Sequence, residues 1–255
     1  MSDEVLFMQS DRALQRLRHL TDQIAESVRL VVYLRRQDDH MVSRYQQGVK
    51  IGWVLRLREW AQEDMSSLYD YHARLDTWQR LLEPTELVVR RFEPDTFVDG
   101  SLYQDFLDAA GIKVRAEDLK VVPKRNESLD AECVEFLRLL NLHRVEHEGE
   151  IPGVIDNRQL VKRLSKTSTG PVLTLPAAFL DTFMAQWEES NRRVALDFLR
   201  DESGQLFHLP RMTRDSTTSQ HLDPARLDHF LELSELPERL HAPLRRLAER
   251  EADSR

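Results

Sequence analysis

The sequence contains little glycine, one cysteine and no long apolar run. Glycine makes up 8 of 255 residues, roughly 3% against a usual ~7%, which favours many helices joined by few glycine turns. The lone Cys133 excludes an intramolecular disulfide and a cysteine-based zinc site, and its setting AECVEFL predicts a buried helix position. No apolar stretch approaches the ~20 residues that span a bilayer. The start MSDEVLFMQSDRALQRL lacks a basic segment followed by a long apolar one, so we expect no signal peptide and a cytoplasmic location.

The charge balance limits the partners that the chain can take. The formal net charge is −8, which disfavours non-specific binding to nucleic acid. A local basic pocket for a small anion is compatible with this overall charge. The length of 255 residues suits one α/β domain or two small ones.

Two short apolar runs predict strands, and apolar periodicity predicts helices between and after them. The runs are RLVVYL at 29–34 and TELVVRRFEPD at 85–95, rich in β-branched residues and each passing into basic residues. Apolar residues at steps of three and four are typical of helices. The segments with this periodicity are 11–27, 37–52, 53–62, 71–82, 100–112, 126–141, 175–199 and 223–251.

Several residues predict where these helices begin, break or end. Asp11 and Ser128 are expected to cap the amino ends of their helices. Pro224 suits the first position of a helix, and Pro84 is expected to end the helix before it. The long segment 175–199 is expected to break near Ser190–Asn191.

The order of elements predicts a helix-rich α/β fold with a small parallel sheet. Strands separated by helices usually pair in parallel. The expected division is an α/β domain over residues 1–210, followed by a linker and C-terminal helices over 211–255. Two strands alone rarely make a stable sheet core, so we expect a further strand ahead of Met1.

Arg35 and Ser43 form the first candidate binding pair, in the segment RLVVYLRRQDDHMVSRYQQGVK. Ligands of open α/β folds bind at the carboxyl ends of parallel strands, and Arg35 directly follows the first predicted strand. Ser43 then falls on the second turn of the next helix. Arginine offers a planar fork of donors for phosphate, and a hydroxyl adds a further hydrogen bond. In the alternative, Arg35 pairs with Asp38 or Asp39, and Ser43 is an ordinary helix residue.

The same segment resembles the part of sulfotransferases that binds the 3′-phosphate of the sulfuryl donor. Three further stretches resemble bacterial sulfotransferase-like proteins: VVRRFEPDTFVDGSLYQDFLDAAGI, KRNESLDAECVEFLRLLN and ESNRRVALDFL. Together the stretches cover most of residues 1–210 in order. The resemblance implies a P-loop-type α/β fold and 3′-phosphoadenosine 5′-phosphosulfate as donor, held by Arg35 and Ser43. The implied acceptor is a small-molecule hydroxyl or amine, expected to be on a carbohydrate.

The chain departs from that family at the 5′-phosphosulfate loop. The family begins with a strand and a loop of the type K-[TS]-G-T-[TS], whose amides and lysine hold the phosphosulfate. No such loop precedes Arg35, and we expect either that the true start lies upstream of Met1 or that the gene is truncated. The nearest string is LSKTSTG, Lys166 to Gly170, which is either a circularly permuted loop or, as we favour, a polar loop between helices. Because the loop is missing, we expect the chain as written to be inactive or only weakly active.

A glutamate between the two phosphate motifs serves as the catalytic base in relatives. By order along the chain, the resemblance makes Glu4 the candidate base in this sequence. A base must reach the acceptor proton through a hydrogen bond. The alternative is that Glu4 is an ordinary residue of a frayed terminus.

Two other charged motifs have weaker functional interpretations. His143 and His147 in HRVEHEGE have the i, i+4 spacing of zinc ligands, but no third ligand is evident, so a solvated helix end is favoured. Arginine pairs usually mark solvated helix faces. Arg192 or Arg193 could nonetheless reach a sulfated or acidic ligand.

The remaining alternatives concern the function as a whole. The chain could be a non-catalytic helical scaffold, or a nucleotide-binding remnant that forms a homodimer through unpaired sheet edges. A polysaccharide-biosynthesis protein with other transfer chemistry is a third possibility. The four tryptophans fall within helical patterns, so core packing is expected, and one of them could instead form an acceptor-sugar platform: Trp53, Trp60, Trp78 and Trp187.

Overall fold

The computed structural model describes residues 5–119, 129–211 and 218–253. Within it the chain divides into two compact units, each made of three separate stretches. The first unit combines Met1–Gln37, Asp64–Pro123 and Thr182–Arg211. The second combines Asp38–Glu63, Lys124–Asp181 and Met212–Arg255.

The first unit contains a two-stranded parallel sheet. Strand β1 (Arg29–Leu34) pairs with β2 (Glu86–Arg91), with Arg29 opposite Glu86 and Leu34 opposite Arg91. Two further hydrogen bonds extend the ladder by one residue, from the Phe92 N–H to the Leu34 carbonyl at 2.7 Å and from the Glu86 N–H to the Val28 carbonyl at 3.2 Å. Both predicted strands and their parallel pairing are therefore confirmed, and the described part of the chain is a helix-rich α/β fold.

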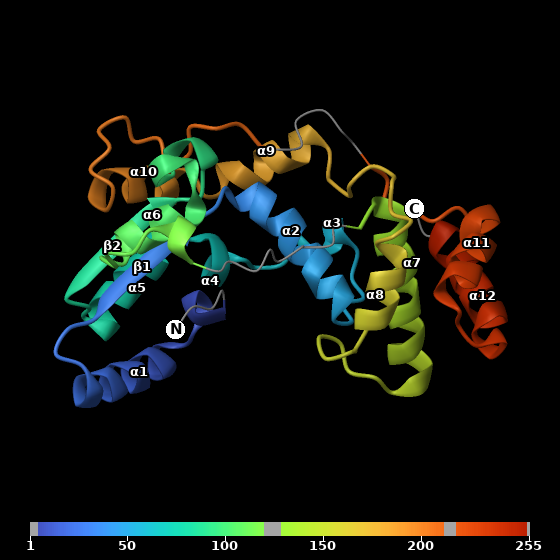
Figure 1. Ribbon diagram of the computed structural model, residues 1–255. Helices are drawn as coiled ribbons and strands as arrows, with labels where there is room; N and C mark the ends of the chain where they lie inside the picture. The colour runs from blue at the N-terminus through green and yellow to red at the C-terminus, as the bar shows by residue number, and fades with distance from the viewer. Residues whose placement is uncertain (1–4, 120–128, 212–217, 254–255) are drawn as a thin grey trace. The chain divides into compact units, whose positions relative to one another are not determined.

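A small apolar cluster lies between α1 and α5, which are neighbours in the first unit (Figure 1). The helix α1 lies along α5, and the Trp78 side chain on α5 packs with Leu14 and Leu82. Arg18 on α1 also donates to the Leu82 carbonyl at 3.1 Å. The helices of this unit are α1 (Asp11–Ile24), α4 (Ser66–Tyr69), α5 (Tyr71–Leu82), α6 (Leu102–Ala109) and α10 (Glu188–Asp197), with short 3₁₀ turns at Val5–Met8, Pro94–Thr96, Val98–Gly100 and Ala116–Asp118.

The second unit is helical and is centred on α7. Almost every residue of α7 is buried, and α8, α11 and α12 belong to the same cluster (Figure 1). Its helices are α2 (Gln37–Lys50), which starts at the last residue of the first unit, α3 (Leu57–Trp60), α7 (Ala131–His143), α8 (Arg158–Leu164), α11 (Leu227–Ser234) and α12 (His241–Asp253). A π-helical turn follows α7 at Arg144–Glu148, and 3₁₀ turns lie at Pro224–Arg226 and Glu238–Leu240. The helix α9 (Ala177–Ala185) runs across the boundary between the units.

A charged network lies inside the second unit. Arg138 is 2% exposed and donates to both carboxylate oxygens of Glu135, at 2.8 and 2.7 Å. The same guanidinium donates to Glu251 on α12 at 2.8 Å and to the Val54 carbonyl at 2.9 Å. Glu135 also accepts from the Gln220 amide at 2.9 Å. Each buried charge thus has a charged or polar partner, which offsets the cost of burying it. Through these bonds Arg138 joins α7 to α12 and to the chain before α3.

Two predicted caps differ from the observed ones. Ser10, not Asp11, caps α1, since Ser10 is extended and its hydroxyl accepts from the Ala13 N–H at 3.4 Å. Asp11 is the first helical residue, where its negative charge interacts favourably with the helix dipole. Ser128 lies outside the described residues, and α7 is capped by Asp130, whose carboxylate accepts from the Cys133 N–H at 2.9 Å.

The expected positions of two helices and two tryptophans were also wrong. The break in the segment 175–199 lies at Gln186–Trp187, where Trp187 leaves the helical line and packs its ring near Tyr69 and Phe183. The segment 53–62 is helical only at Leu57–Trp60. Trp53 therefore lies outside the described helices, packed on Trp60 with 4.9 Å between ring centroids.

The two predicted proline positions lie at helix ends. Pro224 occupies the first position of a 3₁₀ turn, as predicted. Pro84 follows α5, which ends at Leu82 with Glu83 in the left-handed conformation. The described part of residues 211–255, the expected linker and C-terminal helices, contributes to the second unit through α11 and α12. Among the described residues, no helix is long and apolar enough to span a membrane.

Candidate functional site

The carboxyl end of β1 leads directly to Arg35. The strand ends at Leu34, and the Arg35 carbonyl accepts a 2.7 Å hydrogen bond from the Tyr71 hydroxyl at the start of α5. The Arg35 side chain is half-buried. The backbone at this strand end is thus fixed by α5, which sets the point from which Arg35 projects.

The helix α2 begins two residues after Arg35, close to the predicted start. Its first residue, Gln37, is fully buried and exchanges two hydrogen bonds with the Asn191 amide, at 2.6 and 3.2 Å. Ser43 lies on the second turn of α2 and is half-buried. Arg35 and Ser43 lie in one continuous segment of strand, turn and helix. Arg35 belongs to the first unit and Ser43 to the second.

The basic residue at the end of β2 is held by protein groups. The Arg91 guanidinium pairs with Asp201 and donates to the Leu206 carbonyl at 2.6 Å. Hydrogen bonds from Ser203 and from Arg91 lower the pKa of Asp201 to about 2, so its carboxylate is ionised at neutral pH. Arg91 therefore serves the local structure. It is the last residue of β2, opposite Leu34, whereas Arg35 follows the last residue of β1.

Glu93 lies two residues beyond β2 and is 5% exposed. One carboxylate oxygen accepts from the backbone N–H groups of His208 and Leu209, at 2.9 and 2.8 Å. The other oxygen is buried without a hydrogen-bond partner among the described residues. Glu93 thereby ties the segment after α10 to the end of β2.

A polar pocket of about 570 Å³ lies within the first unit, between α5, α10 and the start of β2. His72, Asp76 and Gln79 line it from α5 at i, i+4 and i+7, which places them on one helix face. Arg193, Asp197 and Arg200 line it from α10 and the turn after α10, with the same spacing. Pro84, Thr85, Leu87 and Phe198 complete the wall.

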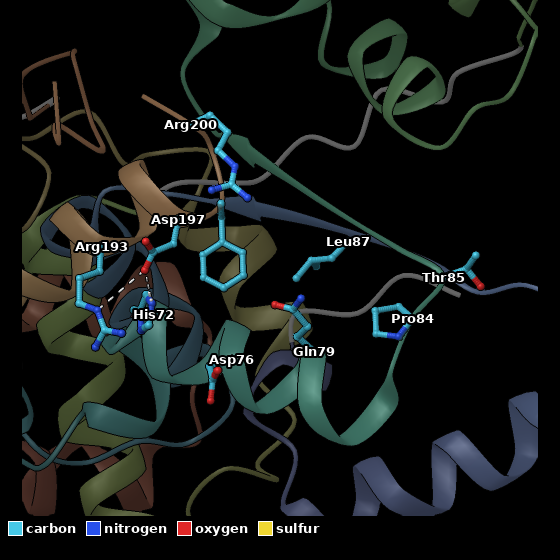
Figure 2. Close-up of a pocket in the computed structure, with 10 residues that line it drawn as sticks. His72, Asp76, Gln79, Pro84, Thr85, Leu87, Arg193, Asp197 and Arg200 are labelled. Carbon is cyan, nitrogen blue, oxygen red and sulfur yellow. Dashed lines mark hydrogen bonds and ion pairs between the residues drawn. The ribbon is translucent and has the colours of Figure 1, made fainter. Parts of the chain in front are cut away.

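One side of the pocket is organised around Asp197 (Figure 2). Its carboxylate accepts from His72 Nε2 at 2.9 Å and lies 3.9 Å from Arg193 Nε. The His72 ring also packs against Phe198, with 5.6 Å between ring centroids. Asp70 accepts from the Ser190 hydroxyl at 2.8 Å, which fixes the amino ends of α5 and α10 together. The charges on this side of the pocket are therefore mutually compensated.

The other side of the pocket has unused hydrogen-bonding capacity. In Figure 2, Arg200, Gln79 and Leu87 point toward a common space. Arg200 makes no hydrogen bond or ion pair within the described part of the chain, and neither does the Gln79 side-chain amide. Arg200 also has a φ of 57°, a left-handed conformation that is uncommon for a non-glycine residue.

The remaining predicted site residues are scattered. Glu4 lies outside the described residues. The loop from Lys166 to Gly170 follows α8, not a strand, and is a polar loop between helices. Its Ser168 hydroxyl oxygen accepts from the Asp130 backbone N–H at 2.6 Å, and its Gly170 N–H donates to the Asp130 carboxylate at 3.0 Å, just before α7. The alternative of a permuted phosphate loop is therefore wrong.

The weaker candidates have structural roles. The His143 and His147 rings contact each other at a tilt of 56°, with 5.0 Å between centroids, and burial lowers the pKa of His143. No group of three metal-binding side chains occurs among the described residues. Burial raises the pKa of Cys133 to about 12, in keeping with the predicted core position. Arg192 is exposed and pairs with Glu189 at 2.8 Å, on the helix that carries the pocket-lining Arg193.

Of the residues that line the pocket, sequence reasoning had proposed only Arg193 for ligand binding, as one of two arginines in a less favoured alternative. The i, i+4, i+7 pattern of polar residues on α5 was available in the sequence and indicates only a polar helix face. The pocket exists because α5 and α10, more than a hundred residues apart, pack together. No local pattern contains that information.

Comparisons with known proteins give no assignment. No family model matches this chain, and no solved structure matches it significantly. A similar sequence is an uncharacterized protein from Archaeoglobus fulgidus, 30% identical over 114 residues. The match covers 44% of this chain and 30% of the archaeal protein, so it spans less than a third of that protein. The site itself must therefore carry any functional proposal.

Proposed function

We propose that this protein is a sulfotransferase-like, P-loop-type α/β protein that binds 3′-phosphoadenosine 5′-phosphosulfate through its 3′-phosphate. The observation that carries the proposal is the local order of one segment: a parallel strand, Arg35 at its carboxyl end, and a helix with Ser43 on its second turn. Ligands of parallel α/β sheets bind at this edge. An arginine there offers a phosphate two parallel hydrogen bonds.

The chemistry that follows is transfer of the sulfuryl group to a hydroxyl, expected to be on a carbohydrate. The sulfur–oxygen bond to the donor phosphate breaks, a new one forms to the acceptor oxygen, and the acceptor proton passes to a base. Glu4 is the candidate for that base. In the sulfotransferase mechanism, a loop of the K-[TS]-G-T type stabilises charge on the phosphate that leaves, and residues 1–34 of this sequence contain no such loop.

Binding of 3′,5′-adenosine bisphosphate, measured by calorimetry, tests the proposal. The wild-type chain should prefer this nucleotide to adenosine 5′-monophosphate, which lacks the 3′-phosphate. Arg35→Ala should remove that preference, with a loss of about tenfold or more. Arg29→Ala is the matched control, because Arg29 lies at the other end of the same strand and pairs with Glu86. Absence of binding, or an unchanged preference in Arg35→Ala, would refute the assignment.

A second function is favoured by the open edges of the sheet. Within the described residues, β1 and β2 pair only with each other, so each has one edge without a strand partner. Such edges favour pairing with another chain. A nucleotide-binding remnant or scaffold that forms a homodimer predicts a dimer by light scattering and no sulfuryl transfer.

A further inference from the structure

The pocket between α5 and α10 has a charge distribution that selects for a particular kind of ligand. Arg193 and Arg200 balance Asp76 and Asp197 in number. Asp197 is already engaged by His72 and lies near Arg193, so their charges are compensated within the protein. Arg200 is the cation of the pocket with no partner among the described residues. One unpaired guanidinium is suited to one anionic group.

The nearby carboxylates disfavour a doubly charged ligand. A phosphate ester carries up to two negative charges at neutral pH, and it would share the pocket with Asp76 and Asp197. A carboxylate carries one charge and offers two oxygens in the plane of the guanidinium fork. The pocket therefore favours a carboxylate over a phosphate.

The rest of the lining suits hydroxyl groups on a compact body. The Gln79 amide offers two donors and an acceptor, and the exposed Asp76 carboxylate accepts. Leu87 and Phe198 supply apolar surface beside these groups. The volume of about 570 Å³ lies within the range of small-molecule sites, on the order of 300–1,000 Å³.

The backbone at Arg200 supports a role for its side chain. Arg200 has a φ of 57°, where glycine would be accommodated without the steric cost of a Cβ atom. The turn around it is ordered, because the backbone N–H groups of Phe198, Leu199 and Asp201 donate to carbonyls of α10. An arginine thus stands where glycine fits best, with its guanidinium directed into the pocket (Figure 2).

We propose that the pocket between α5 and α10 is a binding site for a small hydroxylated carboxylate. Arg200 binds the carboxylate, and Gln79 and Asp76 bind hydroxyl groups. The site lies wholly in the first unit and includes neither Arg35 nor Ser43. It is therefore independent of the proposed binding of a sulfuryl donor.

Calorimetry with three probes tests this assignment. D-glucuronate combines one carboxylate with several hydroxyls, D-glucose has the hydroxyls without the charge, and inorganic phosphate has the charge in another geometry. D-glucuronate should bind more tightly than either of the other two. Phosphate binding as tight as that of D-glucuronate would overturn the preference for a carboxylate, and no binding of D-glucuronate at millimolar concentration would overturn the site.

Two variants locate the binding. Arg200→Gly should weaken D-glucuronate binding by about tenfold to a hundredfold, while its thermal unfolding midpoint stays equal or rises because the left-handed backbone is relieved. Gln79→Glu, which keeps the shape and adds a negative charge, should weaken binding without removing Arg200. Unchanged affinity in both variants would refute the assignment.

Two further variants separate this site from the rest of the molecule. Arg192→Ala should bind D-glucuronate as the wild type does, because Arg192 pairs with Glu189 and does not line the pocket. Arg35→Ala should also bind it normally, and Arg200→Gly should bind 3′,5′-adenosine bisphosphate normally. Equal loss of D-glucuronate binding in Arg192→Ala would indicate non-specific attraction and overturn the proposal.

Discussion

Removing the buried Arg138 side chain should strongly destabilise the second unit. Glu135 is 2% exposed and receives two of its hydrogen bonds from Arg138. In Arg138→Met, the Glu135 carboxylate keeps its hydrogen bond from the Gln220 amide and loses the opposite charge of Arg138. Breaking a buried ion pair from one side typically costs about 3–5 kcal/mol, because the remaining charge stays buried.

The same reasoning predicts that a second substitution restores most of the loss. In Glu135→Leu/Arg138→Met both charges are gone, and apolar side chains of similar length fill the space. Replacing both members of a buried pair is often neutral or stabilising by about 1–4 kcal/mol. Glu251 on α12 and the Val54 carbonyl also lose a donor in the double variant. We therefore expect recovery to be large but incomplete.

The matched control is the exposed pair Glu189–Arg192, which has the same i, i+3 spacing. Arg192→Met should cost less than about 1 kcal/mol, since solvent screens exposed pairs. Urea unfolding followed by both circular dichroism and tryptophan fluorescence measures the three variants against the wild type. The reasoning is refuted if Arg138→Met is as mild as Arg192→Met, or if the double variant is no more stable than Arg138→Met.

Two further predictions concern single titratable groups in the second unit. Burial raises the pKa of Glu251, but the neighbouring Arg138 and Arg56 outweigh this effect and lower it below the ordinary value of 4.5. The ionised Glu251 carboxylate therefore stabilises the fold above pH 4.5, and this contribution is lost as pH falls through the folded-state pKa. The difference in free energy of unfolding between wild type and Glu251→Gln should accordingly shrink on acidification. A constant difference in urea midpoints from pH 7 to about 3 would contradict this assignment. The Cys133 thiol, whose pKa burial raises to about 12, should react with a disulfide reagent at pH 8 only after unfolding; rapid reaction of the native protein would show that the position opens.

The strands and most helices could be predicted because their signals are local. The run RLVVYL becomes β1 at the predicted residues, and the spacing of Leu14 and Leu17 gives α1 its apolar face toward α5. The helix caps were predicted less accurately, because Ser10 and Asp11 are both good capping residues and only the backbone conformation decides between them. The helix break at Trp187 depends on aromatic partners that are distant in the sequence or lie on another turn.

The candidate sites could be predicted only where their residues lie close together in the sequence. Arg35 and Ser43 lie in one segment, so their strand-end and helix positions follow from the sequence. The pairing of Arg138 with Glu251 and the meeting of Gln79 with Arg200 at one pocket do not, because each joins helices far apart in the chain. Sequence patterns mark charged residues as exposed by default, and the buried Arg138 and Glu135 are exceptions that depend on tertiary contacts.

The interleaving of the two units has a consequence for synthesis on the ribosome. Each unit draws on three stretches of chain, so the polypeptide passes between them at residues 37/38, 63/64, 123/124, 181/182 and 211/212. The first unit is incomplete until residues 182–211 emerge, and the second until α11 and α12 are made. Contacts between distant stretches slow folding, because long loops must close first. Neither unit can therefore fold completely while the other is still to be synthesised. For much of its synthesis the nascent chain exposes the apolar faces of both units.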